Sequence, residues 1–395
     1  MTHSTTAPSA SSTPADTPAG ASAEGFAELL AGFRRELDRE LAGFLEAKRR
    51  AATAGSEGAS EAAAMLELID GVASLTSHGG KRLRPALVYY TYRACGGRSA
   101  AAVLPLALAT ELLHTYLLIH DDIMDHAEVR RGQPAAHVRF REAHLAHGWR
   151  GDPRDFGASV GILLGDLAHT WAVELFAGAL VQVGREVEDR GRAEDLSRCF
   201  SSMCQEVIGG QYLELLVALR GGTAEQAGAE ELLSVLRLKS GRYTAERPIQ
   251  LGAILAGTAA EMRASLSRYG AAVGEAFQLQ DDLLGMFGDA ETVGKPVGAD
   301  LTEGKFTFLI HHALAAASAG DRRTIAAAFG RPDLAPEEVA RVQRILEATG
   351  ARRKVGEMIE SRLAVAAGAL AGLPLEDGGR TFFSGLLTYL RERDQ

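Results

Sequence analysis

Apolar residues recur at three- and four-residue spacing almost everywhere from Phe26 onward, as in the run at positions 29, 30, 33, 37, 41 and 45. This is the period of an α-helix with one buried face, and the alternating β-branched runs that indicate strands are scarce. Alanine and leucine, both strong helix formers, dominate the pattern. The sequence therefore predicts an all-α fold, and no shift in composition marks a second domain.

We expect one helical domain over residues 25–395, with its helices separated at clusters of glycine and proline. These clusters are Gly79–Gly80 with Pro85, Gly96–Gly97, 151–153, Gly221–Gly222, 294–298, 330–336 and Gly378–Gly379.

Residues 1–24 differ from the rest, because they are rich in serine, threonine, alanine and proline and have almost no large apolar side chain. Such a segment buries too little apolar surface to fold, so a disordered tail is predicted. It also lacks the basic start and apolar stretch of a secretory signal. No run reaches the roughly 18 uncharged apolar residues of a membrane-spanning helix. Glu111 and His114 interrupt the most apolar stretch, 101–119. We therefore expect no transmembrane segment.

Charge and cysteine content narrow the setting. The formal net charge of -9 argues against a nucleic-acid partner, which would require a basic face. The three cysteines form no CxxC pair, and their odd number argues against a disulfide framework. A soluble protein in a reducing cytoplasm is expected.

Three aspartates, Asp121, Asp122 and Asp125, follow an apolar helical stretch that ends at His120. On a helix, Asp121 and Asp125 lie one turn apart and about 40° around the axis, so both carboxylates point the same way. Gathering acids at a helix C-terminus is unfavourable because the charges repel each other and the helix dipole opposes them. A cation offsets this cost, and Mg²⁺ suits it because Mg²⁺ typically joins one or two carboxylates to substrate phosphates.

A second acidic pair, Asp281–Asp282, follows the apolar run 273–279 and precedes a glycine-rich stretch. Two such clusters at helix ends are expected to face each other across one cavity and to hold metal against a diphosphate. Basic residues lie close by in the sequence: Arg130 and Arg131, and the earlier group Lys81, Arg82 and Arg84. Guanidinium groups bind phosphate through paired hydrogen bonds, and lysine acts as a point charge. The combination indicates a site for two diphosphates, one held through metal and one by cations alone.

Either acidic cluster alone has a second interpretation, a solvated acidic helix end, and a lone helical His114 is more often structural. The order of the motifs favours the functional interpretation. The chain contains, in sequence, GGKRLRP at 79–85, HTYLLIHDDIMDHAEVRRG at 114–132, GQYLE at 210–214, KSGRYTAERP at 239–248, FQLQDDLLG at 277–285 and GKPVGADLTEGK at 294–305. In these residues the chain resembles the trans-isoprenyl diphosphate synthases, the polyprenyl synthetase family.

The resemblance implies a single bundle of long antiparallel helices around a central apolar cavity, usually as a homodimer. It implies an Mg²⁺-dependent prenyltransferase that adds isopentenyl diphosphate to an allylic diphosphate such as dimethylallyl, geranyl or farnesyl diphosphate. The allylic diphosphate leaves, the double bond of isopentenyl diphosphate attacks the allylic cation, and a proton is lost. Water must be kept out because it would trap that cation.

Site residues are carried over from the matching motifs. The metal ligands are expected to be Asp121, Asp122, Asp125, Asp281 and Asp282. The residues expected on the allylic diphosphate are Arg130, Lys239, Gln278 and Lys295. The isopentenyl diphosphate pocket is expected to contain Lys81, Arg84, His114 and Arg131. Ser240 stands where the family often has threonine, and Lys305 matches the later lysine of the last motif. Gln211 and Glu214 are expected to support the site rather than act in it.

Product length in the resembled family depends on bulk just before the first acidic motif, where this chain has Tyr116 and Leu117. A tyrosine five residues before Asp121 resembles synthases that stop at geranylgeranyl diphosphate, with farnesyl diphosphate as the second expectation. A plain core tyrosine is the other interpretation. The chain departs from the family at Gly285, where the fuller second motif has an aspartate.

Three rivals remain. A class I terpene cyclase shares the helices and the aspartates but needs no second diphosphate pocket. A regulatory subunit without chemistry is disfavoured by the complete first motif, although Gly285 keeps it open. A plain helical scaffold would leave the ordered charges unexplained.

Overall fold

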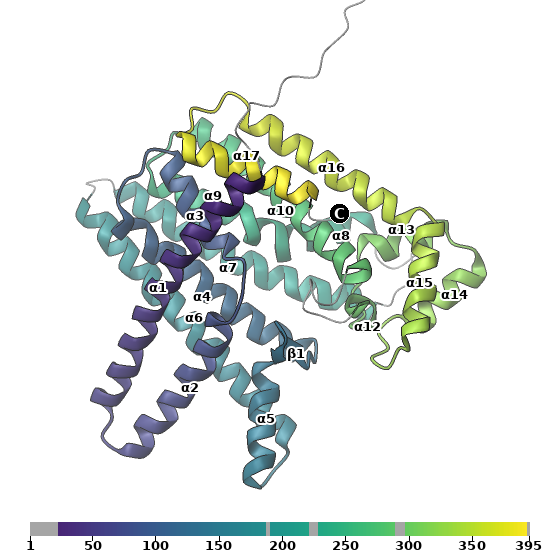
Figure 1. Ribbon diagram of the computed structural model, residues 1–395, viewed down its shortest axis with the longest axis horizontal. Coiled ribbons are helices and arrows are strands. Elements are labelled where there is room, and N and C mark those ends of the chain that lie inside the picture. The colour runs from purple at the N-terminus through teal and green to yellow at the C-terminus, as the bar shows by residue number, and fades with distance from the viewer. Residues whose placement is uncertain (1–22, 187–189, 221–227, 289–296, 393–395) are drawn as a thin grey trace, which may run out of the picture.

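The computed structural model describes residues 23–186, 190–220, 228–288 and 297–392. Nearly all of this part of the chain is helical, which confirms the all-α prediction (Figure 1). Of the tail predicted over residues 1–24, positions 1–22 lie outside the described residues, and the first helix begins at Ala23.

The first half of the chain contains long helices and one short hairpin. Its elements are α1 (Ala23–Gly55), α2 (Ala59–Ser77), α3 (Leu83–Ala94), α4 (Ala100–Met124), β1 (Val129–Arg130), β2 (Gln133–Pro134), α5 (Ala136–His147), α6 (Pro153–Glu186) and α7 (Arg190–Leu219). The second half continues with α8 (Ala229–Val235), a π-helix η1 (Leu236–Glu246), α9 (Arg247–Leu255), α10 (Ala260–Phe287), α12 (Ala299–Thr302), α13 (Phe308–Ala316), α14 (Ala319–Ala328), α15 (Pro336–Ala348), α16 (Ala351–Leu370) and α17 (Asp377–Glu392).

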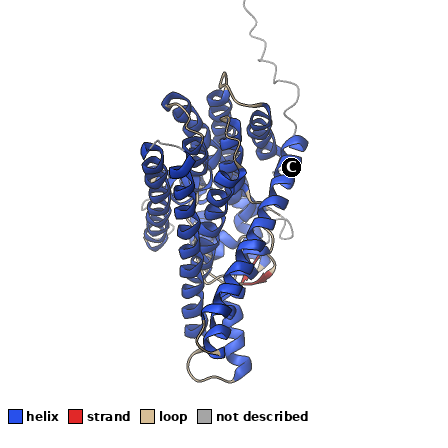
Figure 2. Ribbon diagram, turned by 90° about the vertical axis from the view of Figure 1, so that its left-hand side faces the viewer, coloured by secondary structure: helices blue, strands red, loops and turns tan. Residues whose placement is uncertain are grey.

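The central helix of the bundle is α4, which packs along α6, while α10 packs along η1 and α16. Figure 2 shows the long helices lying side by side as a tall bundle. Most side chains of α4 are buried, including Leu106, Leu112 and Leu113. Burial of such large apolar side chains stabilises the fold by about 1.5–3 kcal/mol each. Because α4 runs through the core, its C-terminal aspartates are delivered to the interior of the bundle.

Within the part of the chain that the structure describes, two helices are long and apolar enough to cross a membrane when judged by length and composition alone. In Ala100–Met124, 72% of the most apolar window is buried inside the protein, as in the core helix of a globular fold. In Pro153–Gly184, 44% of that window is buried, so α6 also presents apolar residues outward.

Several described helix boundaries coincide with the predicted glycine and proline clusters. Gly79–Gly80 separates α2 from α3, and Gly96–Gly97 separates α3 from α4. The clusters at Gly221–Gly222 and 294–296 lie outside the described residues. The break predicted at Gly378–Gly379 is wrong, because both glycines lie in the first turn of α17. The chain turns earlier instead, where Gly372 adopts a φ of 74° and Pro374 cannot continue a helix.

The π-helix η1 was not predicted, although it contains the KSGRYTAE part of one motif. Long π-helices are rare, and the shorter π-bulges occur frequently at functional sites. η1 crosses α7 at Gly210, where an added Cβ would lie 2.2 Å from the backbone nitrogen of Lys239. The absence of a side chain at Gly210 therefore permits the backbone contact that places Lys239 in the interior.

We expect Gly210→Ala to push η1 away from α7, lowering the free energy of unfolding by about 1–3 kcal/mol, the usual cost of overpacking. Gly209→Ala is the matched control, because a Cβ there has no neighbour within 4 Å. Alanine is the better helix former, so this variant should match the wild type or gain up to about 1 kcal/mol. Urea denaturation measures both variants, and equal stability would contradict the close approach.

Candidate active site

The helices enclose a cavity of about 1640 Å³, which brings together most of the residues predicted from the sequence. The predicted residues that line it are Lys81, Arg84, His114, Tyr116, Leu117, Asp121, Arg130, Arg131, Lys239, Ser240, Gln278, Asp281, Asp282 and Lys305. Asp122 and Asp125 are not among the lining residues, and Lys295 lies outside the described residues. Asp121 and Asp281 thus face one cavity from two different helices.

The first acidic cluster forms the C-terminal turn of α4, with Asp125 as the capping residue. Asp121 lines the cavity, and Asp125 forms an ion pair of 2.9 Å with Lys305. Burial raises the pKa of Asp125, and Lys305 opposes that rise more strongly than Asp121 adds to it. Asp122 is buried behind the cavity and accepts a 2.8 Å hydrogen bond from Nε of Arg130. Asp122 therefore orients Arg130 in this structure, and its role as a metal ligand remains a prediction.

The second acidic cluster lies on α10, which continues as a helix through Gly285 to Phe287. Gln278 donates a 2.8 Å hydrogen bond to Asp282 one turn further along. Burial raises the pKa of Asp282 well above its usual range, and the carboxylate of Asp300 is the next largest cause. The carboxyl groups of α10 are therefore crowded by like charge from another element.

Asp300, on the short helix α12, is a cavity residue that the sequence reasoning missed. Its carboxylate occupies the space beside Gly285, where an added Cβ would lie 2.6 Å from Oδ2 of Asp300. The fuller motif has an aspartate at position 285. This chain has Gly285 there instead, and the carboxylate of Asp300 lies close to it. The signal was present in the sequence, because Asp300 is the aspartate of the last motif, five positions before Lys305.

Two lysines interleave with the carboxylates. Lys239 on η1 forms ion pairs with Glu214 of α7 and, at 3.4 Å, with Asp121. Lys305 contacts Glu303 at 2.7 Å besides Asp125. Burial disfavours the charged form of both lysines, but the surrounding carboxylates outweigh it and raise both pKa values. Both side chains are therefore ammonium ions, and Glu214 belongs to the charged site rather than to a polar core pair.

Within the described residues, no three Asp, Glu, His or Cys side chains converge closely enough to hold a metal ion unaided. The donors nevertheless suit Mg²⁺, because carboxylates from three elements crowd one end of the cavity and raise each other's pKa values. Mg²⁺ usually keeps several waters and is bound by one or two carboxylates plus substrate phosphates, not by an all-protein cage. The residues therefore fit a metal that completes its ligand shell with a diphosphate.

The β1–β2 hairpin directs two adjacent arginines to opposite ends of the cavity. Arg131 and Gly132 form its two-residue turn, both with positive φ, as in the type I′ turns that suit tight hairpins. Arg130 reaches Asp122 in the acidic cluster. Arg131 instead donates hydrogen bonds to the backbone oxygens of Leu75 (3.2 Å) and His78 (3.0 Å) at the end of α2.

At the basic end, Arg84 and His114 are held together with Tyr243 and Thr244 of η1. Arg84 donates a 2.8 Å hydrogen bond to Thr244 and lies 4.4 Å from the ring centroid of Tyr243. It also approaches Nε2 of His114 at 3.4 Å, while Nδ1 of His114 lies 2.7 Å from the Tyr243 hydroxyl. Burial lowers the pKa of His114 well below its usual range, and Arg84 is the next largest cause. His114 is therefore neutral, and the positive charge at this end of the cavity comes from Lys81, Arg84 and Arg131.

The apolar wall below Asp121 includes both residues predicted to control product length, Tyr116 and Leu117. The ring centroid of Tyr116 lies 4.8 Å from that of His120 and 5.0 Å from that of His169 on α6. Tyr116 therefore packs against two histidine rings, of which that of His120 also lines the cavity. The cavity thus has charged groups at one end and an aromatic side chain in its wall.

Comparison with known proteins shows that the chain is similar to synthases of isoprenyl diphosphates. A family model described as polyprenyl synthetase matches residues 67–348. The chain is 35% identical to the short chain isoprenyl diphosphate synthase of Methanocaldococcus jannaschii, over 68% of this chain and 73% of that protein. It is 36% identical to the geranylgeranyl diphosphate synthase of Methanosarcina mazei, over 70% and 74%.

Among solved structures, it resembles the geranylgeranyl pyrophosphate synthase of Corynebacterium glutamicum complexed with isoprenyl diphosphate and magnesium. The TM-score is 0.83 at 31% sequence identity, covering 93% of this chain and 99% of that one.

We expect Gly285→Asp to lower activity, although it completes the motif, because the new side chain collides with the Asp300 carboxylate and adds like charge. The double variant Gly285→Asp/Asp300→Ala returns the number of carboxylates to that of the wild type and should recover part of the activity. Steady-state rates of the two variants test this, and a more active Gly285→Asp single variant would contradict it.

The neutral state of His114 predicts a loss of stability in acid. Below about pH 6.5 the unfolded chain binds a proton at His114 that the folded chain does not, so the free energy of unfolding falls by up to about 1.4 kcal/mol per pH unit. His114→Asn should flatten this dependence between pH 7.5 and 5.5, measured by urea denaturation. His147→Asn, at an exposed site on α5, should keep the wild-type slope. Identical slopes in all three proteins would contradict the prediction.

Proposed function

Because this chain belongs to the polyprenyl synthetase family of chain-elongating trans-prenyltransferases, we propose that it produces geranylgeranyl diphosphate. In this proposal it condenses isopentenyl diphosphate head-to-tail with a shorter allylic diphosphate, with Mg²⁺ as cofactor. The observation that supports it best is one cavity with carboxylates at one end and the side chains of Lys81, Arg84 and Arg131 at the other. Two diphosphates of different chemistry fit such a cavity side by side.

The allylic diphosphate is assigned to the acidic end. Mg²⁺ held by Asp121, Asp125, Asp281 and Asp282 would withdraw charge from this leaving group. Arg130, Lys239 and Lys305 line the same end of the cavity and supply fixed positive charge for the oxygens of the departing diphosphate. Such preorganised charge lowers the barrier because it need not reorient as the bond breaks.

Isopentenyl diphosphate is assigned to the basic end, against Lys81, Arg84 and Arg131. The allylic carbon–oxygen bond breaks with its electron pair leaving on the diphosphate. The double bond of isopentenyl diphosphate then supplies the electron pair of the new carbon–carbon bond, and a proton leaves the neighbouring carbon. The released diphosphate is the proton acceptor proposed by family analogy. Neutral His114, held by Arg84 and Tyr243, contributes hydrogen bonding and shape rather than charge.

A homodimer is proposed as the working form. Large apolar side chains on α6 and α7 stand exposed in the single chain, as expected for a face that a second copy covers. Away from the cavity they are Ile162, Leu163, Val173, Val181 and Leu219, whereas Ile208, Tyr212 and Leu215 are exposed but line the cavity. Sedimentation of the purified chain at the mass of one copy would overturn this assignment.

The cytoplasmic location expected from the sequence also remains a proposal. It is supported by Cys95, Cys199 and Cys204, which are all free thiols.

The decisive assay is Mg²⁺-dependent incorporation of labelled isopentenyl diphosphate into longer diphosphates by the isolated chain. We expect incorporation with dimethylallyl, geranyl or farnesyl diphosphate, and a loss of about 10²-fold or more for Asp121→Asn. A cyclase would consume an allylic diphosphate without incorporation, and a regulatory subunit or scaffold would show no turnover. No incorporation with any of the three primers would overturn the proposal.

Product length is expected to depend on Tyr116. Tyr116→Ala should open the wall below Asp121 and lengthen the product by at least one isoprene unit, as sized by chromatography. Tyr116→Phe is the matched control, because it keeps the ring between His120 and His169 and should leave the product unchanged. Leu117→Ala examines the other candidate. An unchanged distribution in Tyr116→Ala, or lengthening by Leu117→Ala alone, would remove Tyr116 from this role.

A further inference from the structure

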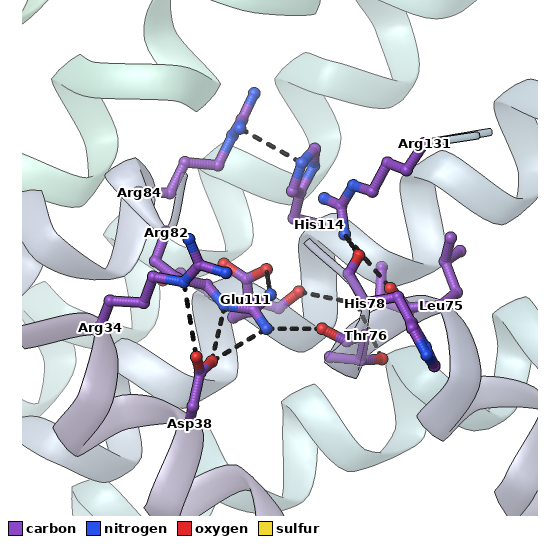
Figure 3. Close-up of polar contacts among 12 residues, drawn as sticks. Arg34, Asp38, Leu75, Thr76, His78, Arg82, Arg84, Glu111, His114 and Arg131 are labelled. Atoms are coloured by element: carbon purple, nitrogen blue, oxygen red, sulfur yellow. Dashed lines mark hydrogen bonds and ion pairs between the residues drawn. The ribbon is translucent and has the colours of Figure 1, made fainter. Parts of the chain in front are cut away.

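Arg82 borders the cavity together with Lys81 and Arg84, but its guanidinium group is turned toward Asp38, Thr76 and Glu111 (Figure 3). Its side chain is fully buried. Nε donates to Asp38 at 3.0 Å, one terminal nitrogen donates to Glu111 at 2.5 Å, and the other donates to the backbone oxygen of Thr76 at 2.6 Å. One guanidinium group therefore joins α1, α2 and α4 at the point where α3 begins.

Glu111 is the carboxylate that interrupts the apolar stretch of α4, and its side chain is only 3% exposed. A buried carboxylate of this kind requires a close, hydrogen-bonded cation, and removing one partner leaves an uncompensated charge. Glu111 lies three residues before His114 on α4, so the ion pair forms part of the wall at the basic end of the cavity. The position of Arg82 is thereby tied to the helix that carries both His114 and Asp121.

The backbone at Arg82 is left-handed, with φ 53° and ψ 32°, at the N-terminal cap of α3. This region is unfavourable for a residue other than glycine and persists only where surrounding contacts hold it. The three partners of Arg82 provide that hold. With the Arg82 side chain anchored among the helices, Lys81 lies 5.8 Å from the ring of Tyr389 and Arg84 lies over Tyr243, both lining the cavity.

Arg131 depends on the same end of α2. Backbone oxygens in the last turn of a helix lack helical partners. Here Arg82 takes that of Thr76, while Arg131 takes those of Leu75 and His78 (Figure 3). Between them, Gly80 packs so closely that an added Cβ would lie 3.0 Å from the Arg131 guanidinium. A shift of Arg82 therefore displaces the end of α2 and, with it, Arg131.

We propose that Arg82, through its ion pair with Glu111, is a positioning residue for the isopentenyl diphosphate pocket. It fixes the backbone from which Lys81 and Arg84 extend and the helix end that orients Arg131. The inference rests on the proposed function. Its effect falls mainly on the basic end, because Arg82 bonds to α1, α2 and α4, whereas η1, α10 and α12 carry most of the charged groups at the acidic end.

The test compares affinity for isopentenyl diphosphate, measured by calorimetry without any allylic substrate, with the KM values for both substrates. Arg82→Lys keeps the charge but lacks the planar fork that serves three partners at once. We expect its Kd and KM for isopentenyl diphosphate to rise about tenfold or more, as small displacements of binding groups do. The KM for the allylic diphosphate should stay within about twofold of the wild-type value, because the allylic site shares no direct partner with Arg82.

Arg247→Lys is the matched control. Arg247 forms a similar two-contact ion pair with Glu206, at 2.8 and 2.6 Å, away from the cavity. It should lower the Tm without changing either KM. The double variant Arg82→Met/Glu111→Leu separates the two roles further. It removes both buried charges, so the Tm should recover while the affinity for isopentenyl diphosphate stays weak.

Should Arg82→Lys fail to fold, Asp38→Asn answers the same question, because Asp38 is 40% exposed on α1 and tolerates substitution better. It should weaken isopentenyl diphosphate binding by about threefold, as expected for loss of one partner of three. Unchanged affinity in variants with a lowered Tm, or an equal rise in both KM values, overturns the inference. If the wild type incorporates no isopentenyl diphosphate, the proposed function itself is wrong. The incorporation assay is therefore done first.

Discussion

The repulsion among carboxylates held inside a helical bundle is the constraint on which this structure depends. Three elements bring acidic residues to one end of the cavity, where burial and like charge raise the pKa values of Asp282 and Asp125. Such a cluster persists only beside cations. The close crossing at Gly210 places Lys239 among these acids, and the end of α12 leads to Lys305. Much of the irregular geometry of the fold, including the π-helix, serves this balance of charge.

The opposite end of the cavity has a different requirement under the proposed function, because its cations have to remain available to bind a phosphate. Backbone oxygens, an aromatic ring and a hydroxyl group take up part of the hydrogen-bonding capacity of Arg131 and Arg84 without cancelling their charge. The carboxylates that Figure 3 labels in this region, Glu111 and Asp38, both form ion pairs with Arg82. The hairpin turn at Arg131 and Gly132 separates the two chemistries, because it sends adjacent arginines to different ends.

The helical period and the order of the motifs predicted the all-α fold and many of the charged residues that line the cavity, because both are local features of the sequence. They did not reveal the features that depend on tertiary contacts. Asp122 belongs to the same motif as Asp121, yet it turns inward to Arg130. Gly285 suggested a weakened site, but the neighbouring space is taken by Asp300 from a separate helix. The π-helix has no periodic signal, and the inward turn of Arg82 follows from partners on three other helices. Spacing along one helix cannot reveal such exchanges.

The lysines among the aspartates supply positive charge to the acidic end of the cavity before any substrate arrives. Under the proposed function, an entering diphosphate would offer Lys239 and Lys305 new oxygen partners of greater negative charge. Asp121 and Asp125 would then lose these counterions at the moment when a phosphate lies beside them. In that case the resting ion pairs would couple the freeing of the aspartates to the binding of substrate.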